Sequence, residues 1–273
     1  MGEKYFSDHV LMENVIHIQD PLGVFATLII GQNKALLFDT AYGIGNLRQH
    51  VEGLTKLPLI VVNSHGHVDH LCGNYHFDQV FIHENDIEIA QQDTSRDMRK
   101  NIIKQAKDKG VLPADYDQAN YLSAGPGNLV PINEGHCFDL GGITLEVIAV
   151  PGHTRGSIGL LCKEKRLLLL GDAANSYLFL FLPESTNLDE YIKTLRKINS
   201  LDFDHYIISH HGDLLPKSKI NDYIECALNI DVEKSKPFVF PPLKDIKALI
   251  YSHKDRKPGH PDYTAIIYTK DKL

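Results

Sequence analysis

The feature that most restricts how this chain can fold is a stretch of closely spaced histidines that follows a short apolar run. Residues 57–62, with the sequence Leu-Pro-Leu-Ile-Val-Val, have the length and the β-branched content of a buried strand. His65, His67, Asp69 and His70 come directly after this run. The predicted strand therefore delivers three histidines and one aspartate to its C-terminal end, and this is the composition of a metal site.

The spacing within this stretch favours metal ligands over the polar residues of a surface loop. His65 and His67 are two residues apart on an extended segment, so their imidazoles can point the same way, and Gly66 between them allows a tight turn. Asp69 and His70 follow at once and are placed to hold a second ion beside the first. Imidazole and carboxylate ligands suit zinc, and also iron or manganese. We therefore expect two divalent metal ions, zinc first, with iron or manganese as alternatives.

Further strand-like runs end in residues of the same kind. Run 143–150 leads to His153, run 166–170 to Asp172, and run 205–209 to His210 and His211. A single histidine in a loop is usually only solvated, and the position at a strand end is what favours a ligand role for His153. A buried aspartate without a partner is costly, so a cation beside Asp172 is the economical interpretation; a solvent-exposed strand end is the alternative.

Length and charge narrow the class of protein. The 273 residues can bury a substantial core, and we expect a single domain over residues 1–273. The net charge of -7 argues against nucleic acid as a partner. Residues 1–6 carry no apolar signal segment and no run reaches membrane-spanning length, so we expect a cytoplasmic protein without membrane contact. The oligomeric state is left open.

The remaining segments predict helices and one terminal strand pair. At about 84–122 helix formers and charges of both signs replace the strand pattern, which predicts a helical insertion. This insertion is a candidate lid or oligomer contact, or a solvated segment with no role in binding. Asn187, with Glu190 three residues on, predicts the start of a helix. Residues 248–251 and 263–268 have the composition of a strand pair.

Asp39 closes a predicted strand and has two interpretations. The run 35–39, Ala-Leu-Leu-Phe-Asp, is followed by a segment of helical spacing at 44–54. Asp39 could orient a metal ligand from behind, or it could cap the turn that precedes the helix. The sequence does not choose between these roles.

Taken in order, the motifs read His-x-His-x-Asp-His, Pro-Gly-His-Thr, Gly-Asp and His-Gly. Their order and their placement at strand ends, over roughly residues 14–216, resemble the metallo-β-lactamase-fold hydrolase superfamily. The resemblance implies an α/β fold, namely an αββα sandwich of two mixed β-sheets packed face to face, with helices on the outer faces.

The resemblance also implies a role for each matching residue. The first metal would be held by His65, His67 and His153, the second by Asp69, His70 and His211, and Asp172 would bridge both. Relatives often have Gly-His-Gly where this chain has His210-His211-Gly212, so the match assigns the ligand to His211. Asp69 would also orient a water or accept its proton, which makes it the expected catalytic residue.

The expected reaction is hydrolysis of a small molecule by a metal-bound hydroxide, because two adjacent metals lower the pKa of a shared water. An ester, thioester or lactone is the first expectation and a phosphodiester the second. Lactonase relatives carry a tyrosine three residues after the bridging aspartate, where this chain has Asn175, and this disfavours lactone opening. Diiron oxidoreductases of the same fold, which generally have glutamate at the position of His67, and a non-catalytic metal-binding module are the alternatives.

Overall fold

The structure is a computed structural model that describes residues 5–254, 258, 260 and 263–273. Residues 1–4, which carry part of the expectation about an N-terminal signal, lie outside this range. Within the described residues, none of the helices has both the length and the apolar character that crossing a membrane requires.

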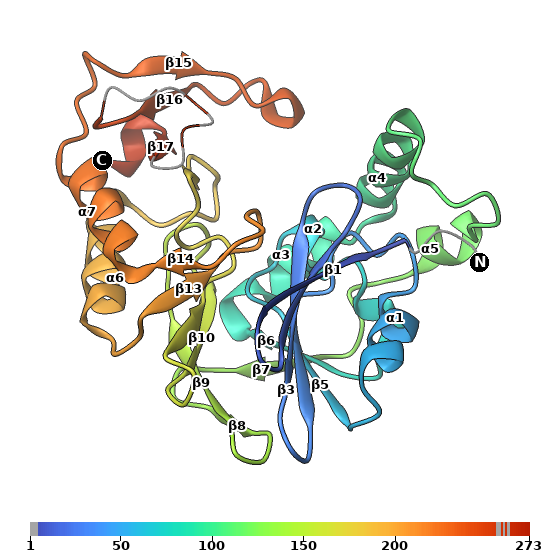
Figure 1. Ribbon diagram of the computed structural model, residues 1–273. Coiled ribbons are helices and arrows are strands. Elements are labelled where there is room, and N and C mark those ends of the chain that lie inside the picture. Colours follow the sequence, from blue (N-terminus) through green and yellow to red (C-terminus); the bar gives the residue numbers. More distant parts are fainter. Residues whose placement is uncertain (1–4, 255–257, 259, 261–262) are drawn as a thin grey trace.

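The N-terminal half of the chain forms a seven-stranded mixed sheet (Figure 1). Its strands lie in sequence order: β1 (Ser7–Met12), β2 (Val15–Gln19), β3 (Phe25–Ile30), β4 (Ala35–Phe38), β5 (Leu59–Val62), β6 (Val80–His83) and β7 (Leu129–Ile132). Strands β1 to β4 pair antiparallel, and β4 to β7 pair parallel. The parallel pairing places β5 inside the sheet, and its C-terminal end leads directly to the histidine stretch.

A second mixed sheet follows in the sequence. Its spatial order is β14 (Leu215–Pro216), β13 (His205–Ile207), β11 (Leu167–Leu169), β10 (Ile158–Cys162), β9 (Thr144–Ala149) and β8 (Cys137–Asp139). Strands β11 and β13 pair parallel, and the other neighbours pair antiparallel. Both β11 and β13 lead into predicted ligand residues.

The two sheets pack face to face because each presents an apolar face to the other. One cluster of fully buried side chains joins Leu36 and Val62 of the first sheet to Leu145, Leu160 and Leu169 of the second. Close packing of this kind fixes the distance between the sheets. The loops at the ends of the two sheets are therefore held at a fixed separation.

Helices cover the outer faces of the sandwich. On the first sheet, α1 (Leu47–Leu54) packs Leu47 and Val51 against the strands. On the second, α6 (Leu188–Ser200) and α7 (Ile220–Leu228) bury their apolar sides. Helix α6 starts at the predicted cap, where Asn187 Oδ1 accepts a hydrogen bond from the Glu190 backbone N at 2.9 Å. The arrangement confirms the predicted αββα sandwich.

A series of short helices lies between β6 and β7. It contains η2 (Glu84–Asp86), α3 (Ile87–Asp93), α4 (Arg96–Asp108) and α5 (Gln118–Ser123), and it packs beside α2 (Val68–Leu71) and η1 (Asn74–His76) of the histidine stretch. Arg99 of α4 is fully buried and donates to the carbonyl oxygens of Cys72 and Gly125, both at 3.0 Å. Its guanidinium carbon lies 4.6 Å from the ring centroid of Tyr121. These contacts tie α4 to the loop that follows His70.

The C-terminal region forms a third sheet that the sequence analysis only half predicted. Its order is β12 (Tyr177–Leu180), β17 (Ala265–Tyr268), β16 (Ala248–Tyr251) and β15 (Lys236–Phe238). The predicted terminal pair is confirmed, since β16 and β17 pair antiparallel. Strand β12 joins them by parallel pairing with β17. The single turns η3 (Lys217–Lys219), η4 (Pro241–Leu243) and η5 (Lys270–Lys272) complete this half.

Candidate metal centre

The loops that follow β5, β9, β11 and β13 bring their polar side chains together, although these strands belong to two different sheets. Three overlapping groups of histidines and carboxylates form there, and within each group the potential ligand atoms lie within 4.8 Å of one another. The groups are His65, His67 and His153; His65, His70 and Asp172; and Asp69, His70 and His210. Six of the seven predicted ligands are thus found at one place.

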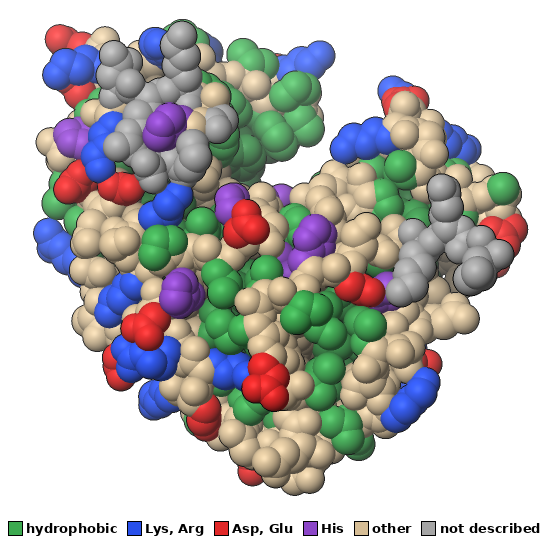
Figure 2. Space-filling model, viewed as in Figure 1, with side chains coloured by type: hydrophobic (Ala, Val, Ile, Leu, Met, Phe, Trp, Pro, Cys, Tyr) green, Lys and Arg blue, Asp and Glu red, His purple; other side chains and the backbone are tan. Residues whose placement is uncertain are grey.

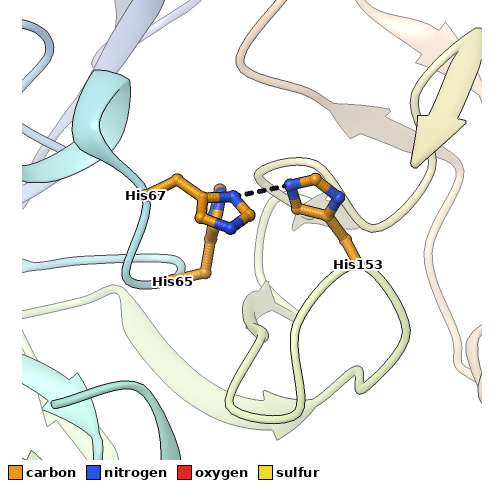
Figure 3. Close-up of side chains that lie close together, drawn as sticks. All are labelled: His65, His67 and His153. Atoms are coloured by element: carbon orange, nitrogen blue, oxygen red, sulfur yellow. Dashed lines mark hydrogen bonds between the residues drawn. The ribbon is translucent and has the colours of Figure 1, made fainter. Parts of the chain in front are cut away.

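The first group consists of histidines from two loops (Figure 3). His65 and His67 come from the end of β5, and the ring of His153 approaches from the loop after β9. The Nδ1 atom of His67 lies 2.9 Å from Nε2 of His153. The ring centroid of His65 lies 4.7 Å from that of His67 and 4.9 Å from that of His153. Three imidazoles therefore surround one small volume.

The second group, as we call Asp69, His70 and His210 from here on, mixes histidine and carboxylate. Asp172 lies between it and the first group. His210 Nε2 and His70 Nε2 lie 3.3 and 3.5 Å from the same Asp69 oxygen, Oδ2. Asp172 faces this group with both oxygens, since Oδ2 is 3.3 Å from His210 Nε2 and Oδ1 is 3.6 Å from His70 Nε2. The same Oδ2 lies 3.8 Å from His153 Nε2. Asp172 therefore reaches both groups.

The structure places His210 beside Asp69 and His70, where the resemblance implied His211. The side chain of His211 is used by the turn that follows, where its Nδ1 accepts a hydrogen bond from the Asp213 backbone N at 3.2 Å. Its carbonyl oxygen lies 3.2 Å from His17 Nε2, which holds the backbone of this turn on the first sheet. The match to Gly-His-Gly is therefore out of register by one residue in this loop.

Hydrogen bonds on the side away from the centre determine which ring nitrogen is protonated in His65 and His70. Asp39 Oδ2 accepts from His70 Nδ1 at 2.9 Å and from Ser64 Oγ at 2.8 Å, and Ser64 Oγ in turn accepts from His65 Nδ1 at 2.9 Å. Because Nδ1 carries the proton in both rings, Nε2 presents its lone pair to the centre. Asp39, which has a positive φ of 69°, therefore orients ligands.

His67 is held the opposite way round. Its Nε2 donates to Glu184 Oε1 at 2.8 Å, and this leaves Nδ1 to face His153. His153 Nδ1 donates to the carbonyl oxygen of Phe179 at 3.1 Å, so its Nε2 lone pair faces His67. Two lone pairs 2.9 Å apart repel unless a proton or a cation lies between them. This arrangement fits a cation site.

The pKa shifts differ between the two groups. Burial lowers the pKa of His65 well below its usual value and that of His153 to about 4, and neighbouring histidines act in the same direction. Burial also acts against charge on His210, but Asp172 and Asp69 outweigh it and raise that pKa to about 10. Burial favours the neutral form of Asp69, yet His70 and His210 hold its pKa well below the usual range.

Unpaired atoms test whether these residues fit a metal. His65 Nε2, His70 Nε2 and Asp172 Oδ1 are buried and make no hydrogen bond with the described residues. Buried polar atoms without partners are rare and costly in proteins. All three face the centre, and imidazole nitrogen and carboxylate oxygen are ordinary ligands of divalent transition metals. The residues therefore fit a site for such ions.

Sequence reasoning missed two acidic residues that position the ligands. Asp86 accepts from the backbone N atoms of Gly66 and Gly156, both at 2.8 Å, and from Thr154 Oγ1 at 2.7 Å. It thereby ties the loop of His65 to the loop of His153. The other residue is Glu184, described above. Neither residue belongs to a metal-binding motif, so the sequence does not mark it.

A hollow in the molecular surface gives access to this region. Figure 2 shows histidine side chains on the floor of the hollow, with the C-terminal sheet on one side and the helices α4 and α5 on the other (compare Figure 1). The side chain of His210 is 29% exposed and that of Asp69 is 18% exposed, so the second group is reachable by solvent. A substrate in the hollow can therefore reach the carboxylates.

Comparison with known proteins gives related sequences and related folds. The chain is 26% identical over 187 residues to the acyl-coenzyme A thioesterase MBLAC2 of Homo sapiens, and the match covers 64% of this chain and 66%, just under two thirds, of that protein. The metallo-beta-lactamase from Pontibacter korlensis has the same fold, with a TM-score of 0.62, 16% identity, and coverage of 82% of this chain and 100% of that chain.

A second solved structure also shares the fold. The protein TTHA1623, solved in a di-iron-bound form, matches with a TM-score of 0.53 and 20% identity, and the match covers 73% of this chain and 93% of that chain. The family model described as the metallo-beta-lactamase superfamily matches residues 19–210, which include all residues of both ligand groups. This chain therefore belongs to the metallo-beta-lactamase superfamily.

Proposed function

We propose that this protein is a dinuclear metal-dependent hydrolase whose substrate is a thioester. The observation that carries the proposal is the meeting of the two ligand groups at Asp172, whose carboxylate reaches both. Membership of the superfamily supports hydrolysis, and the likeness to the acyl-coenzyme A thioesterase MBLAC2 supports a thioester in particular. Phosphodiesters and lactones are the competing substrates.

Each ligand residue has a proposed place. His65, His67 and His153 would hold one ion, Asp69, His70 and His210 the other, and Asp172 would contact both. When bound, such a pair of divalent ions lowers the pKa of a water that they share and polarises the carbonyl oxygen of the substrate. We propose zinc for both positions, since the donors are imidazole nitrogen and carboxylate oxygen, with iron and manganese as alternatives.

Asp69 has the proposed role in proton transfer. Its carboxylate is partly exposed at the hollow, and His70 and His210 keep it ionised by holding its pKa well below the usual range. An ionised carboxylate at this position can orient the attacking water and accept its proton. A thioester releases a thiolate, which is a good leaving group, so a separate general acid is not required.

A substrate panel with and without chelator tests the proposal. The zinc-loaded protein is assayed on an acyl-coenzyme A thioester, a carboxylic ester, a lactone and a phosphodiester. We expect thioester hydrolysis that a chelator abolishes and added zinc restores. Asp172→Asn should lower the rate at least about 100-fold, because the contact shared by both ions is weakened.

Two results would contradict the proposal. A preference for the lactone or the phosphodiester would contradict the thioester as the substrate, while the assignment as a hydrolase would stand. No chelator-sensitive turnover of any substrate would remove the hydrolase, and bound iron with oxygen consumption would then indicate an oxidoreductase. His211→Ala is the matched control, since this neighbouring histidine lies outside both groups.

A further inference from the structure

An exposed apolar surface lies on one face of the C-terminal sheet, to which both edge strands contribute. We call it the apolar wall and define it by five side chains: Phe179 of β12, Phe238 of β15, and Val239, Phe240 and Leu243 of the segment that leads into and forms η4. Val239 is 65% exposed and Leu243 is 38% exposed, and the three phenylalanines are half-buried. Large apolar side chains gathered at one exposed place often mark a binding surface.

The apolar wall is continuous with the metal centre. The ring centroid of Phe179 lies 6.2 Å from that of His153, and the carbonyl oxygen of Phe179 is the acceptor for His153 Nδ1. On its other side, the Phe179 ring lies 5.4 Å from Phe240 and 6.1 Å from Phe238. An apolar group that extends from the reacting carbon past His153 therefore meets an unbroken aromatic surface.

The two sides of the hollow differ in chemistry. Figure 2 shows apolar side chains on the side formed by β15 and η4, and Lys and Arg side chains over α4 on the opposite side. Lys100 and Lys104 are among the exposed residues of α4. One apolar side and one basic side, with the metal centre between them, suit a molecule that is apolar at one end and anionic at the other.

We propose that the apolar wall binds the acyl chain of a medium- or long-chain acyl thioester while the anionic thiol moiety lies toward α4. The inference rests on the proposed thioesterase function and adds the substrate class. A substrate is favoured over a second copy of this chain because the wall faces the hollow and adjoins a metal ligand. Each methylene buried on the wall raises affinity roughly fourfold, so affinity should increase with acyl length.

Binding of non-hydrolysable analogues tests the inference without turnover. The zinc-loaded protein is titrated calorimetrically with S-dodecyl-coenzyme A and S-ethyl-coenzyme A, two thioethers that differ only in chain length. We expect the S-dodecyl analogue to bind at least roughly 100-fold more tightly. Val239→Asp should weaken the S-dodecyl analogue at least about tenfold and leave the S-ethyl analogue within about twofold, because a charge then faces the chain.

Leu228→Asp provides the matched control. Leu228 is 54% exposed at the end of α7, outside the apolar wall, and its substitution should leave both analogues unaffected. Since Val239 and Leu228 are both exposed, neither variant should unfold the protein. Equal affinity of the wild type for both analogues, or unchanged S-dodecyl binding by Val239→Asp, would overturn the inference.

Two further outcomes separate the competing explanations. If Val239→Asp dissociates a dimer in sedimentation velocity and leaves S-dodecyl binding unchanged, the wall is an interface between copies and the inference fails. If the S-dodecyl analogue binds at the wall but no thioester is hydrolysed in a chelator-sensitive way, the proposed function fails and the wall remains. If thioesters of all chain lengths are hydrolysed at equal rates and bound with equal affinity, the proposed function stands and the inference about the apolar wall fails.

Discussion

The two ligand groups of the metal centre are built on different physical grounds. In the first group, His65 and His153 are buried with lowered pKa values, and Asp86 holds their loops through backbone hydrogen bonds. In the second, His210 is balanced by the carboxylates of Asp69 and Asp172, and its pKa is raised to about 10. The first group is therefore shaped by backbone hydrogen bonds and by Glu184 outside it, and the second by charge pairing among its own side chains.

This difference shows what an ion would contribute to each group. The second group can neutralise itself, because protonated His210 and the ionised carboxylates of Asp69 and Asp172 offset one another. In the first group, Nδ1 of His67 and Nε2 of His153 lie 2.9 Å apart, and the carboxylate of Glu184 lies on the outer side, where it raises the pKa of His67 against the effect of burial. An ion would replace existing charge pairs in the second group and the hydrogen bond between two imidazoles in the first.

The largest expected effect comes from His210→Ala. The second group would lose the one ligand that β13 supplies, and thioester hydrolysis should fall about a thousandfold, since metal assistance is worth several kcal/mol. Bound zinc, measured by elemental analysis, should fall from two ions to one per chain. His211→Ala should match the wild type in both measurements. Loss of zinc in His211→Ala with none in His210→Ala would contradict the proposed ligand role of His210.

Removal of the buried charge of Arg99 tests how strongly α4 is anchored to the loop that follows His70. Arg99→Met leaves the carbonyl oxygens of Cys72 and Gly125 without donors and should cost about 3 kcal/mol of unfolding free energy, measured by urea denaturation. Arg96→Met, an exposed change in the same helix, should cost less than about 0.5 kcal/mol. Equal losses in the two variants would show that the buried contacts do not anchor α4.

Substitution of Asp39 should affect the two groups unequally. Asp39→Asn weakens the acceptor of His70 Nδ1 directly and that of His65 only through Ser64, so the second group should lose about 10- to 100-fold in zinc affinity and the first group less. Stepwise zinc titration with a competing chelator measures both steps. Asp213→Asn, near His211, should change neither. Equal weakening of the two steps would remove the distinction between the groups.

The smallest effect is expected from Glu184→Gln. The amide oxygen still accepts from His67 Nε2 while the charge is lost, so the first group should lose less than about tenfold in zinc affinity. The second group should be unaffected in the same titration. Glu184→Ala should weaken the first group more, because it removes the acceptor. A larger loss in the second group than in the first would contradict the assignment of Glu184 to His67.

Much of the fold and of the centre follows from local sequence. The order of the motifs predicted the superfamily, and the resemblance to that superfamily implied the two mixed sheets. The spacing of His65, His67, Asp69 and His70 brings them together because a single loop carries them. Contiguous motifs of this kind are set by local geometry, which a sequence shows directly.

What the sequence did not reveal depends on contacts between distant residues. His210 and His211 are adjacent, and only the folded chain shows which of them faces the centre and that His17, far away in the sequence, contacts the backbone of the second. Asp86 and Glu184 act through partners far away in the chain. Strand β15 contains Pro237 and only three residues, so its composition gave no strand signal.

The parallel pairing of β12 with β17 sets an order of events for the growing chain. Strand β12 and the segment after it supply Phe179 and Glu184, which accept hydrogen bonds from two of the three imidazoles of the first group. Strand β17 leaves the ribosome much later than any ligand, so a nascent chain has all its metal-binding side chains before it has the support behind them. A metal ion bound during synthesis would therefore be held by imidazole rings that are not yet fixed in place. Tight coordination would follow only after β17 has paired with β12.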